Sequence, residues 1–224
     1  MFPPYLQEPS PAFGGGTVAC TLSHVSEHPV LRATRWLGVA DPDLERFDRF
    51  RKWLEDEAIP AGGLGPNEAG RITERHLVDS VLFAIGWPDA DPPQTVVDLG
   101  SGVGLPALPL ALLWPETEVT AVERAGRRVD LLRRVARVLE VQNLVVEQTS
   151  LENAPQASMV TMRAVLPPAK WGAIVPHILQ GGRGIVAAPA NHPRDEDTVV
   201  VPKELSGSER VFQVFRTTET GRFT

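Results

Sequence analysis

A strand followed by closely spaced glycines, at residues 95–106, is the feature that most restricts how this chain can fold. Residues 95–99 are β-branched and apolar, which predicts a buried strand. Gly100, Gly102 and Gly104 then permit backbone angles and close approaches that a Cβ would obstruct. Pro106 suits the first turn of a helix, where its missing N–H is not needed. We therefore predict a strand, a turn open to a ligand, and a helix.

Two classes of cofactor site share this strand, turn and helix. The dinucleotide fingerprint G-x-G-x-x-G/A is met in its looser form by Gly102, Gly104 and Ala107. Asp98, however, would repel a pyrophosphate and suits the cationic amino-acid end of a ligand. S-adenosylmethionine has such an end and carries no phosphate. The motif therefore favours S-adenosylmethionine, with a dinucleotide as the alternative.

A second predicted strand ends on an acid. Residues 118–123 read as a strand, and Glu123 at its end is placed to accept hydrogen bonds from both hydroxyls of a ribose. The alternative is a solvated loop acid. Further strands are predicted at 144–149, 159–163 and 183–188, with helices at 124–139 and 169–179, and two terminal strands near 198–205 and 210–217 that form an antiparallel hairpin. This alternation predicts an α/β fold with a parallel sheet covered on both faces and a ligand at the carboxyl ends of its strands.

The N-terminal part has a different character. Residues 1–40 are rich in proline and glycine and are expected to be poorly organised, apart from a short helix at 30–37. Residues 41–90 are expected to form a helical cap, with helices over 41–58 and 67–85. Residues 91–224 are expected to form the cofactor-binding domain, and 41–224 is expected to be one compact unit.

Arginines crowd the helix predicted after Glu123. The stretch has one acid, Asp130, and its apolar residues recur at spacings of three and four, which turns most arginines outward. An exposed arginine face is commonly only solvated, and the alternative is that part of it holds a phosphate backbone. The net charge of −6 argues against a protein that coats nucleic acid by bulk electrostatics.

Composition excludes several other classes. A hydrophobic content of 42% and a charged content of 22% are those of an ordinary globular protein. The chain has no apolar run of the roughly 20 residues that a membrane span needs. A single cysteine, Cys20, rules out an internal disulfide framework and leaves no thiolate cluster for a metal. We expect a cytoplasmic monomer without a metal cofactor.

The chain resembles a known family, the bacterial small-subunit (16S) ribosomal RNA guanine-N7 methyltransferases, also called the glucose-inhibited division protein B family. The specific matches are the string R-H-L-V-D-S at 75–80 and the continuation L-P-A-L-P-L at 105–110, which follows the glycine motif. Where most members have Lys-Gly after the fifth strand, this chain has Ala188-Pro189-Ala190, which marks it as a divergent member.

The resemblance implies a class I S-adenosylmethionine-dependent methyltransferase fold: a mostly parallel seven-stranded sheet with an antiparallel terminal strand and an N-terminal helical cap. It implies methyl transfer to N7 of a guanine in small-subunit ribosomal RNA, or in the ribosomal particle. Guanine N7 has a lone pair and no proton to lose, so positioning suffices and no general base is required. Gly100, Leu105, Leu151, Glu152 and Arg163 resemble the family's cofactor contacts. The full candidate cofactor set is Asp98, Gly100, Gly102, Gly104, Leu105, Glu123, Leu151, Glu152 and Arg163.

The candidates on the substrate side are Arg75, His76, Arg127 and Arg128. No catalytic residue is certain, and His76 and Arg163 are the candidates. His76 either lies beside the incoming base or is a helix histidine bonded to Asp79 or a backbone carbonyl. Arg163 needs a carboxylate partner, which could be Glu123, Glu152 or the cofactor.

Two other functions stay open. The chain could be a methyltransferase that acts on another RNA or a small metabolite, or a protein that binds S-adenosylmethionine without catalysis.

Overall fold

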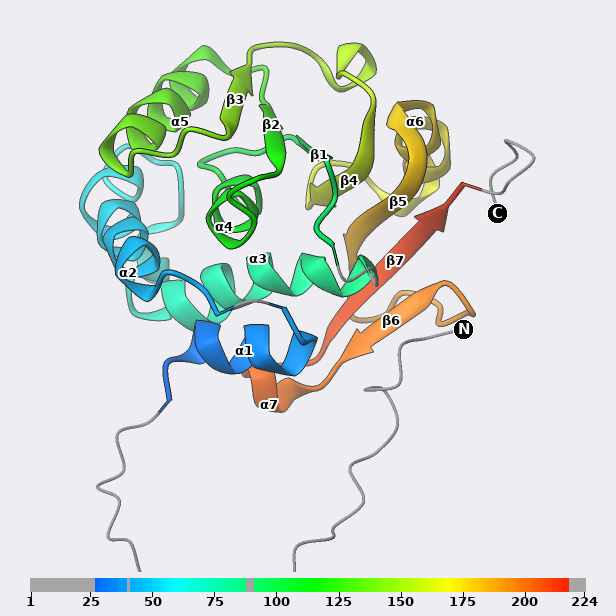
Figure 1. Ribbon diagram of the computed structural model, residues 1–224, viewed down its shortest axis with the longest axis horizontal. Coiled ribbons are helices and arrows are strands. Elements are labelled where there is room, and N and C mark those ends of the chain that lie inside the picture. Colours follow the sequence, from blue (N-terminus) through cyan, green and yellow to red (C-terminus); the bar gives the residue numbers. More distant parts are fainter. Residues whose placement is uncertain (1–26, 40, 88–90, 218–224) are drawn as a thin grey trace, which may run out of the picture.

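The computed structural model describes residues 27–39, 41–87 and 91–217. Most of the segment predicted to be poorly organised, residues 1–26 and 40, lies outside the described residues. A sheet with helices on both faces makes up the body of the molecule (Figure 1). The predicted α/β fold is therefore confirmed.

The sheet has seven strands in the order β3-β2-β1-β4-β5-β7-β6. Strands β3, β2, β1, β4 and β5 pair in parallel, whereas β7 runs antiparallel to both β5 and β6. The predicted terminal hairpin is therefore present. The strands are β1 (Thr95–Leu99), β2 (Glu118–Val122), β3 (Leu144–Glu147), β4 (Ala157–Arg163), β5 (Leu179–Ala188), β6 (Thr198–Val201) and β7 (Arg210–Arg216).

Helices α4, α5 and α6 follow the parallel strands, and the other helical segments precede β1 or lie between strands. The α-helices are α1 (Pro29–Leu37), α2 (Leu44–Trp53), α3 (Asp79–Val81), α4 (Ala107–Leu113), α5 (Gly126–Val138), α6 (Trp171–Ile178) and α7 (Lys203–Ser206). The π-helical segments are η2 (Leu54–Ala58) and η4 (Ile72–Val78), and the 3₁₀ segments are η3 (Pro66–Arg71), η5 (Leu82–Gly86), η6 (Leu151–Asn153) and η7 (Pro168–Lys170).

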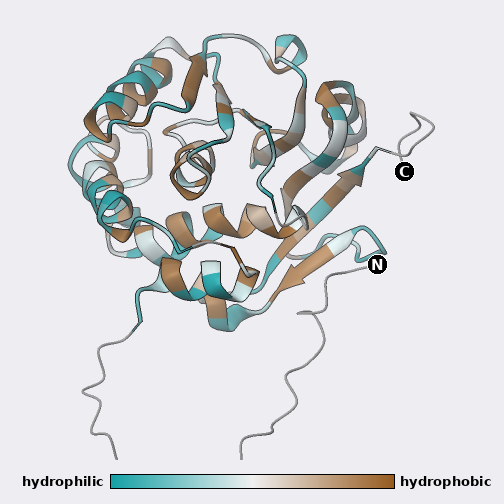
Figure 2. Cartoon of the chain, in the orientation of Figure 1, coloured by the Kyte–Doolittle hydropathy of each residue, from teal (hydrophilic) through white to brown (hydrophobic). Residues whose placement is uncertain are grey.

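The two faces of the sheet bury two hydrophobic cores. Val96 belongs to the core under the cap helices, whereas Val97 and Leu99 belong to the core under α6, as the alternation of side chains along a strand requires. Helix α4 is buried on all sides because it lies between the sheet and the cap, which explains its uniformly apolar sequence. Figure 2 shows hydrophobic residues along α4 and the strands, and mixed faces on α2 and α5.

The cap packs against the sheet domain through both apolar and polar contacts. Arg46 of α2 donates to the carbonyls of Leu139 and Glu140 at 2.7 and 2.8 Å, and Arg49 donates to Val138 at 2.5 Å. These guanidinium groups satisfy carbonyls at the C-terminal end of α5 that have no partner within the helix. The predicted division into domains stays a prediction.

Two segments differ from the sequence-based expectations, and a third agrees with them. The helix predicted over 67–85 is a continuous helical run whose pitch changes from 3₁₀ to π, then α, then 3₁₀. Residues 203–205, predicted as the end of a strand, belong to the short helix α7 (Lys203–Ser206) after Pro202. The helix expected near 30–37 is α1, and its Val30 and Ala33 are fully buried, so it packs with the cap. In the described part of the chain, no helix combines the length and apolarity that a membrane span needs.

Candidate functional site

The turn between β1 and α4 forms one wall of a cavity of about 580 Å³ at the carboxyl ends of the strands. The backbone N–H groups of Gly100 and Ser101 donate to the Val122 carbonyl at 2.8 and 3.0 Å, which fixes the turn to the end of β2. A Cβ on Gly102 would meet open space, whereas one on Gly100 would lie 2.6 Å from Val165. We call this the glycine-turn cavity. Its lining is Gly63, Leu64, Gly100, Ser101, Gly102, Val103, Leu105, Glu123, Arg124, Arg128, Thr149, Ser150, Leu151, Glu152, Arg163, Ala164, Val165 and Leu166.

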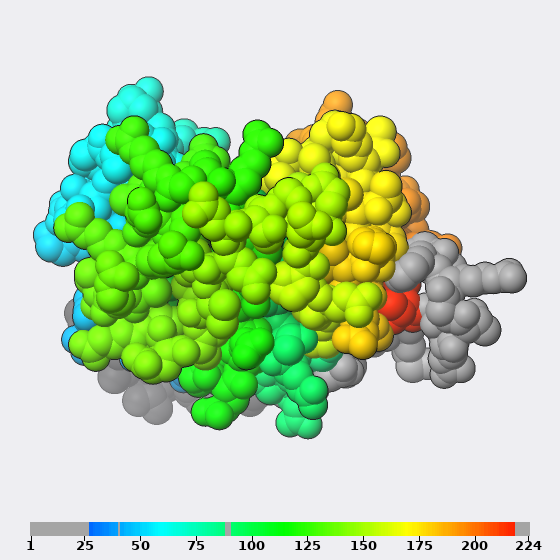
Figure 3. Space-filling model, turned by 90° about the horizontal axis from the view of Figure 1, so that it is seen from above, coloured from blue at the N-terminus to red at the C-terminus, as the bar shows by residue number. Residues whose placement is uncertain are grey.

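Segments distant in the sequence meet around this cavity. Figure 3 shows the green, yellow-green and yellow segments, which carry residues from about 120 to 175, side by side on one face of the molecule. Most of the candidate cofactor residues line the cavity, namely Gly100, Gly102, Leu105, Glu123, Leu151, Glu152 and Arg163. The parallel strands bring them together because their carboxyl ends share one edge of the sheet.

Glu123 ties the two sides of the glycine-turn cavity together. Its carboxylate is only 5% exposed and accepts hydrogen bonds from the Gly102 N–H at 3.1 Å and the Ala125 N–H at 2.9 Å. Arg128 of α5 lies 3.7 Å from the same carboxylate. Each carboxylate oxygen can accept a second hydrogen bond, so the group can also bind hydroxyl donors in the cavity.

Asp98 lies beneath the cavity and is not part of its lining. It is 1% exposed, and its carboxylate accepts hydrogen bonds from the Thr161 hydroxyl at 2.9 Å and the Ala107 N–H at 3.3 Å. The side chain therefore joins β1 to β4 and α4. The expected contact of its carboxylate with the cationic end of a ligand stays a prediction.

Gly104 also lies outside the lining, although the sequence grouped it with the cofactor residues. Its φ is +95°, and a Cβ there would lie 2.5 Å from Leu108. The glycine is therefore needed for the turn to pack against α4.

Arg163, the last residue of β4, lies between two cavities. It lines the glycine-turn cavity and also a second cavity of about 870 Å³, and the two share Arg163, Ala164 and Leu166. The carboxylates of Asp79 and Asp98 interact electrostatically with its guanidinium group. Within residues 27–39, 41–87 and 91–217, however, the guanidinium group forms no hydrogen bond or ion pair. Neither Glu123 nor Glu152, the protein partners that the sequence suggested, pairs with it. Its donors are therefore available to a ligand.

The second cavity lies between the cap and the carboxyl end of β4, next to the first, and we call it the cap cavity. It contains the predicted Arg75 and His76 together with residues that the sequence did not single out. Its lining is Gly70, Arg71, Glu74, Arg75, His76, Asp79, Arg163, Ala164, Leu166, Pro168, Trp171, Ala187, Ala188, Pro189, Ser206, Gly207, Ser208 and Arg210.

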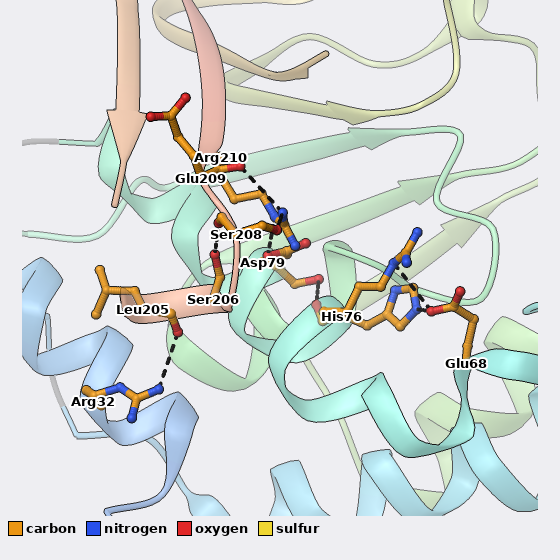
Figure 4. Close-up of polar contacts among 11 residues, drawn as sticks. Arg32, Glu68, His76, Asp79, Leu205, Ser206, Ser208, Glu209 and Arg210 are labelled. Atoms are coloured by element: carbon orange, nitrogen blue, oxygen red, sulfur yellow. Dashed lines mark hydrogen bonds and ion pairs between the residues drawn. The ribbon is translucent and has the colours of Figure 1, made fainter. Parts of the chain in front are cut away.

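His76 is 9% exposed, and its Nε2 lies 2.9 Å from a Glu68 oxygen (Figure 4). Burial lowers the pKa of His76 below its ordinary value, and the charge of Arg163 lowers it further. The neutral ring then donates from Nε2 to Glu68, and its buried Nδ1 has no hydrogen-bond partner among the residues that the structure describes. The hydrogen-bond partner of the His76 ring is thus Glu68. The sequence had suggested Asp79 or a backbone carbonyl.

The remaining substrate candidates, Arg127 and Arg128, lie in different environments. Arg128 lines the glycine-turn cavity, whereas Arg127 is exposed on α5 and lines neither cavity. The apolar stripe of α5, Val129, Leu132 and Val135, is buried as predicted. Within the described residues, no three His, Cys, Asp or Glu side chains gather as a metal site would require. The expected absence of a metal stays a prediction.

The strand order, the antiparallel β7 and the glycine turn beside an acid at the end of β2 define the class I S-adenosylmethionine-dependent methyltransferase fold. A family profile described as rRNA small subunit methyltransferase G matches residues 43–218. The chain therefore belongs to this family, and the resemblance inferred from its motifs is confirmed.

Individual relatives agree. The chain is 37% identical over 140 residues to the ribosomal RNA small subunit methyltransferase G of Acidothermus cellulolyticus, covering 62% of each chain. It is 36% identical over 163 residues to that of Mycobacterium leprae strain TN, covering 69% of this chain and 64% of the relative. The matches thus span slightly less than two thirds of these relatives.

Among solved structures, the chain is similar to the precorrin-6y C5,15-methyltransferase of Geobacter metallireducens GS-15. The TM-score is 0.45 at 13% identity, and the match covers 60% of this chain and 85% of that one.

The buried carboxyl of Asp98 predicts a particular pH dependence of stability. Burial raises its pKa from 3.8 to about 6, so the folded protein holds the proton more tightly than the unfolded chain. The resulting stabilisation is complete below about pH 3.8 and is lost as the pH rises through about 6. In Asp98→Asn, the amide can still bond to Thr161 and Ala107 but does not titrate.

Urea unfolding of both proteins between pH 7 and 4 measures this effect. The unfolding free energy of the wild type relative to Asp98→Asn should increase as the pH falls, by up to about 3 kcal/mol. A difference that is constant, or that shrinks toward acid, would show that Asp98 is not held in this environment.

Proposed function

We propose that this chain transfers a methyl group from S-adenosylmethionine to N7 of a guanine in small-subunit ribosomal RNA. The observation that carries the proposal is the pair of cavities that meet at Arg163, Ala164 and Leu166. A donor held in one and a base held in the other would have their reacting atoms at a shared wall. Membership in the rRNA small subunit methyltransferase G family supports this substrate.

The glycine-turn cavity fits the methyl donor. Its volume of about 580 Å³ is that of a small-molecule site. Glu123 has acceptor capacity for the ribose hydroxyls, and the open space at Gly102 lets a ligand approach the backbone. The unpaired donors of Arg163 suit the carboxylate of an amino-acid moiety. These contacts make Glu123, Gly102 and Arg163 the proposed binding residues.

The residues of the site are suited to positioning. When bound, S-adenosylmethionine supplies a sulfonium methyl group: the N7 lone pair forms the new carbon–nitrogen bond as the carbon–sulfur bond breaks, and the positive charge passes to the base. Because N7 loses no proton, the site needs no general base. The environment of His76 is consistent with a site that has no general base, since its Nε2 is hydrogen-bonded to Glu68 and its Nδ1 is buried. Its role would be to shape the wall of the cap cavity.

The cap cavity offers features that a flipped-out nucleotide requires. Arg71 and Arg75 provide positive charge at its cap side, and Trp171 and Leu166 provide apolar surface. Enzymes that modify a base inside folded RNA commonly extrude it into such a pocket. That the protein acts as a cytoplasmic monomer stays a prediction.

Purified protein tests the proposal directly. With S-adenosylmethionine carrying a labelled methyl group, it should label small-subunit ribosomal RNA, either naked or in the particle, and nuclease digestion should give 7-methylguanosine. Small-subunit RNA isolated from a strain lacking the gene is the unmodified substrate. Binding of S-adenosylhomocysteine without transfer to either substrate would instead indicate a non-catalytic binding protein.

A second candidate, methylation of another RNA or a small metabolite, is favoured by one observation. Ala188 and Pro189 line the cap cavity where most family members have a Lys-Gly pair, so this wall lacks a cation. The salt dependence of the reaction separates an RNA from a small substrate, because counterion release accompanies phosphate contacts only.

The exposed face of α5 provides the variant for this test. Arg127 and Arg133 are exposed and form no ion pair in the described part, whereas Arg128 pairs with Glu123 and Arg134 with Glu57. For an RNA substrate, Arg127→Gln combined with Arg133→Gln should raise KM and lower the slope of log KM against log salt by about 1 to 2. Lys203→Gln, an exposed cation on α7, is the control. An unchanged slope would show that α5 does not contact the substrate.

A further inference from the structure

An ion pair in the cap cavity has no role in the mechanism above. Asp79 begins α3 and Arg210 begins β7, 131 residues further along the chain. The Arg210 Nε donates to the Asp79 Oδ1 at 2.7 Å, and both residues line the cap cavity (Figure 4). The two side chains are largely buried, with exposures of 14% and 25%. Burial of such a pair costs desolvation energy and is weak evidence of a stabilising role.

The pair is held in place by the turn after α7. Arg210 also donates from Nη1 to the Ser208 hydroxyl, and the Ser206 hydroxyl donates to the Ser208 carbonyl at 2.8 Å. Arg32 of α1 reaches the carbonyl of Leu205 at 3.5 Å, which links this turn to the cap. The orientation of the ion pair is therefore fixed from both sides (Figure 4).

Each partner keeps one unused polar atom. Asp79 Oδ2 accepts no hydrogen bond from any residue that the structure describes, and Arg210 Nη2 donates none within the same residues. The cap cavity is thus bordered by a fixed hydrogen-bond acceptor next to a fixed donor. Glu74 is the other carboxylate of the lining, but it is exposed and forms no hydrogen bond in the described part, so water competes for it.

Guanine carries the complementary pattern on its Watson–Crick edge. O6 is an acceptor, and the adjacent N1–H and N2–H₂ groups are donors, whereas adenine has a donor at N6 and an acceptor at N1. An arginine can donate to O6 while a carboxylate accepts from N1–H and N2–H₂. The same pair would set its carboxylate against the N1 lone pair of adenine.

We propose that Asp79 and Arg210 select guanine by binding its Watson–Crick edge, which makes them specificity-determining residues of the cap cavity. This inference rests on the proposed function. The geometry agrees, because N7 lies on the opposite side of the purine from N2 and can face the wall shared with the glycine-turn cavity. Arg163 in that wall interacts electrostatically with Asp79, so pair and wall are close together.

The experiment compares guanine with inosine, which lacks only the 2-amino group. Once the methylated guanine has been mapped, small-subunit RNA is assembled by ligation with guanosine or inosine at that position. The wild type should show a kcat/KM at least tenfold higher for guanosine, because inosine keeps N1–H but leaves the Asp79 carboxylate without the N2–H₂ donor. A wild-type ratio near one would overturn the inference whatever the variants do.

Asp79→Asn is the decisive variant. Its amide oxygen can keep the bond from Arg210, which turns the amide N–H₂ toward the donors of guanine. We expect kcat/KM for guanosine to fall about 100-fold and the ratio of guanosine to inosine to approach one. Glu209→Gln, which removes an exposed acid that pairs with Arg194 outside the cavity, should keep both values.

The outcomes separate the two proposals. If Asp79→Asn lost its overall structure, it would bind S-adenosylhomocysteine more weakly than the wild type. We expect calorimetry to find this binding unchanged. Transfer by Asp79→Asn with the wild-type ratio would overturn the role of the pair and leave the proposed function standing. A wild type that methylates no small-subunit RNA would overturn both.

Discussion

The buried carboxylate of Glu123 is the contact on which the rest of the site depends. By accepting the N–H groups of Gly102 and Ala125, it joins the glycine turn after β1 to the end of β2 and so fixes the width of the cavity between them. The Val122 carbonyl strengthens the same junction by accepting from Gly100 and Ser101. A buried carboxylate is costly unless hydrogen-bond donors satisfy it, and here backbone N–H groups supply those donors.

A second constraint comes from the cap. The all-apolar α4 can be buried only if the sheet covers one side and the cap helices the other. That packing brings the irregular helical run from 66 to 86 over the end of β4, with His76 and Asp79 facing the cap cavity. Helical segments of π pitch are frequent at functional sites, and here one carries Arg75 and His76. The cap thereby adds a second cavity to a fold whose sheet alone provides the first.

The sequence predicts the parts of the site that local patterns encode. The strand, turn and helix at 95–113 and the acid at the end of β2 follow from apolar runs, glycine spacing and the rule that ligands lie at the carboxyl ends of parallel strands. The burial of Asp98 does not follow, because strand alternation does not reveal whether a carboxylate at the strand end faces a ligand or the helix behind it. The bond to Thr161 decides this, and it joins residues 63 positions apart. Asp79 and Arg210 are further apart still, and only the antiparallel placement of β7 brings them together.

A crystal structure of the chain with S-adenosylhomocysteine tests the central claim most directly. The ligand should occupy the cavity between the glycine turn and Glu123, with both ribose hydroxyls bonded to the Glu123 carboxylate and its amino-acid carboxylate near Arg163. Electron density for the ligand at any other place, or a ribose that leaves Glu123 bonded only to Gly102 and Ala125, would contradict the account.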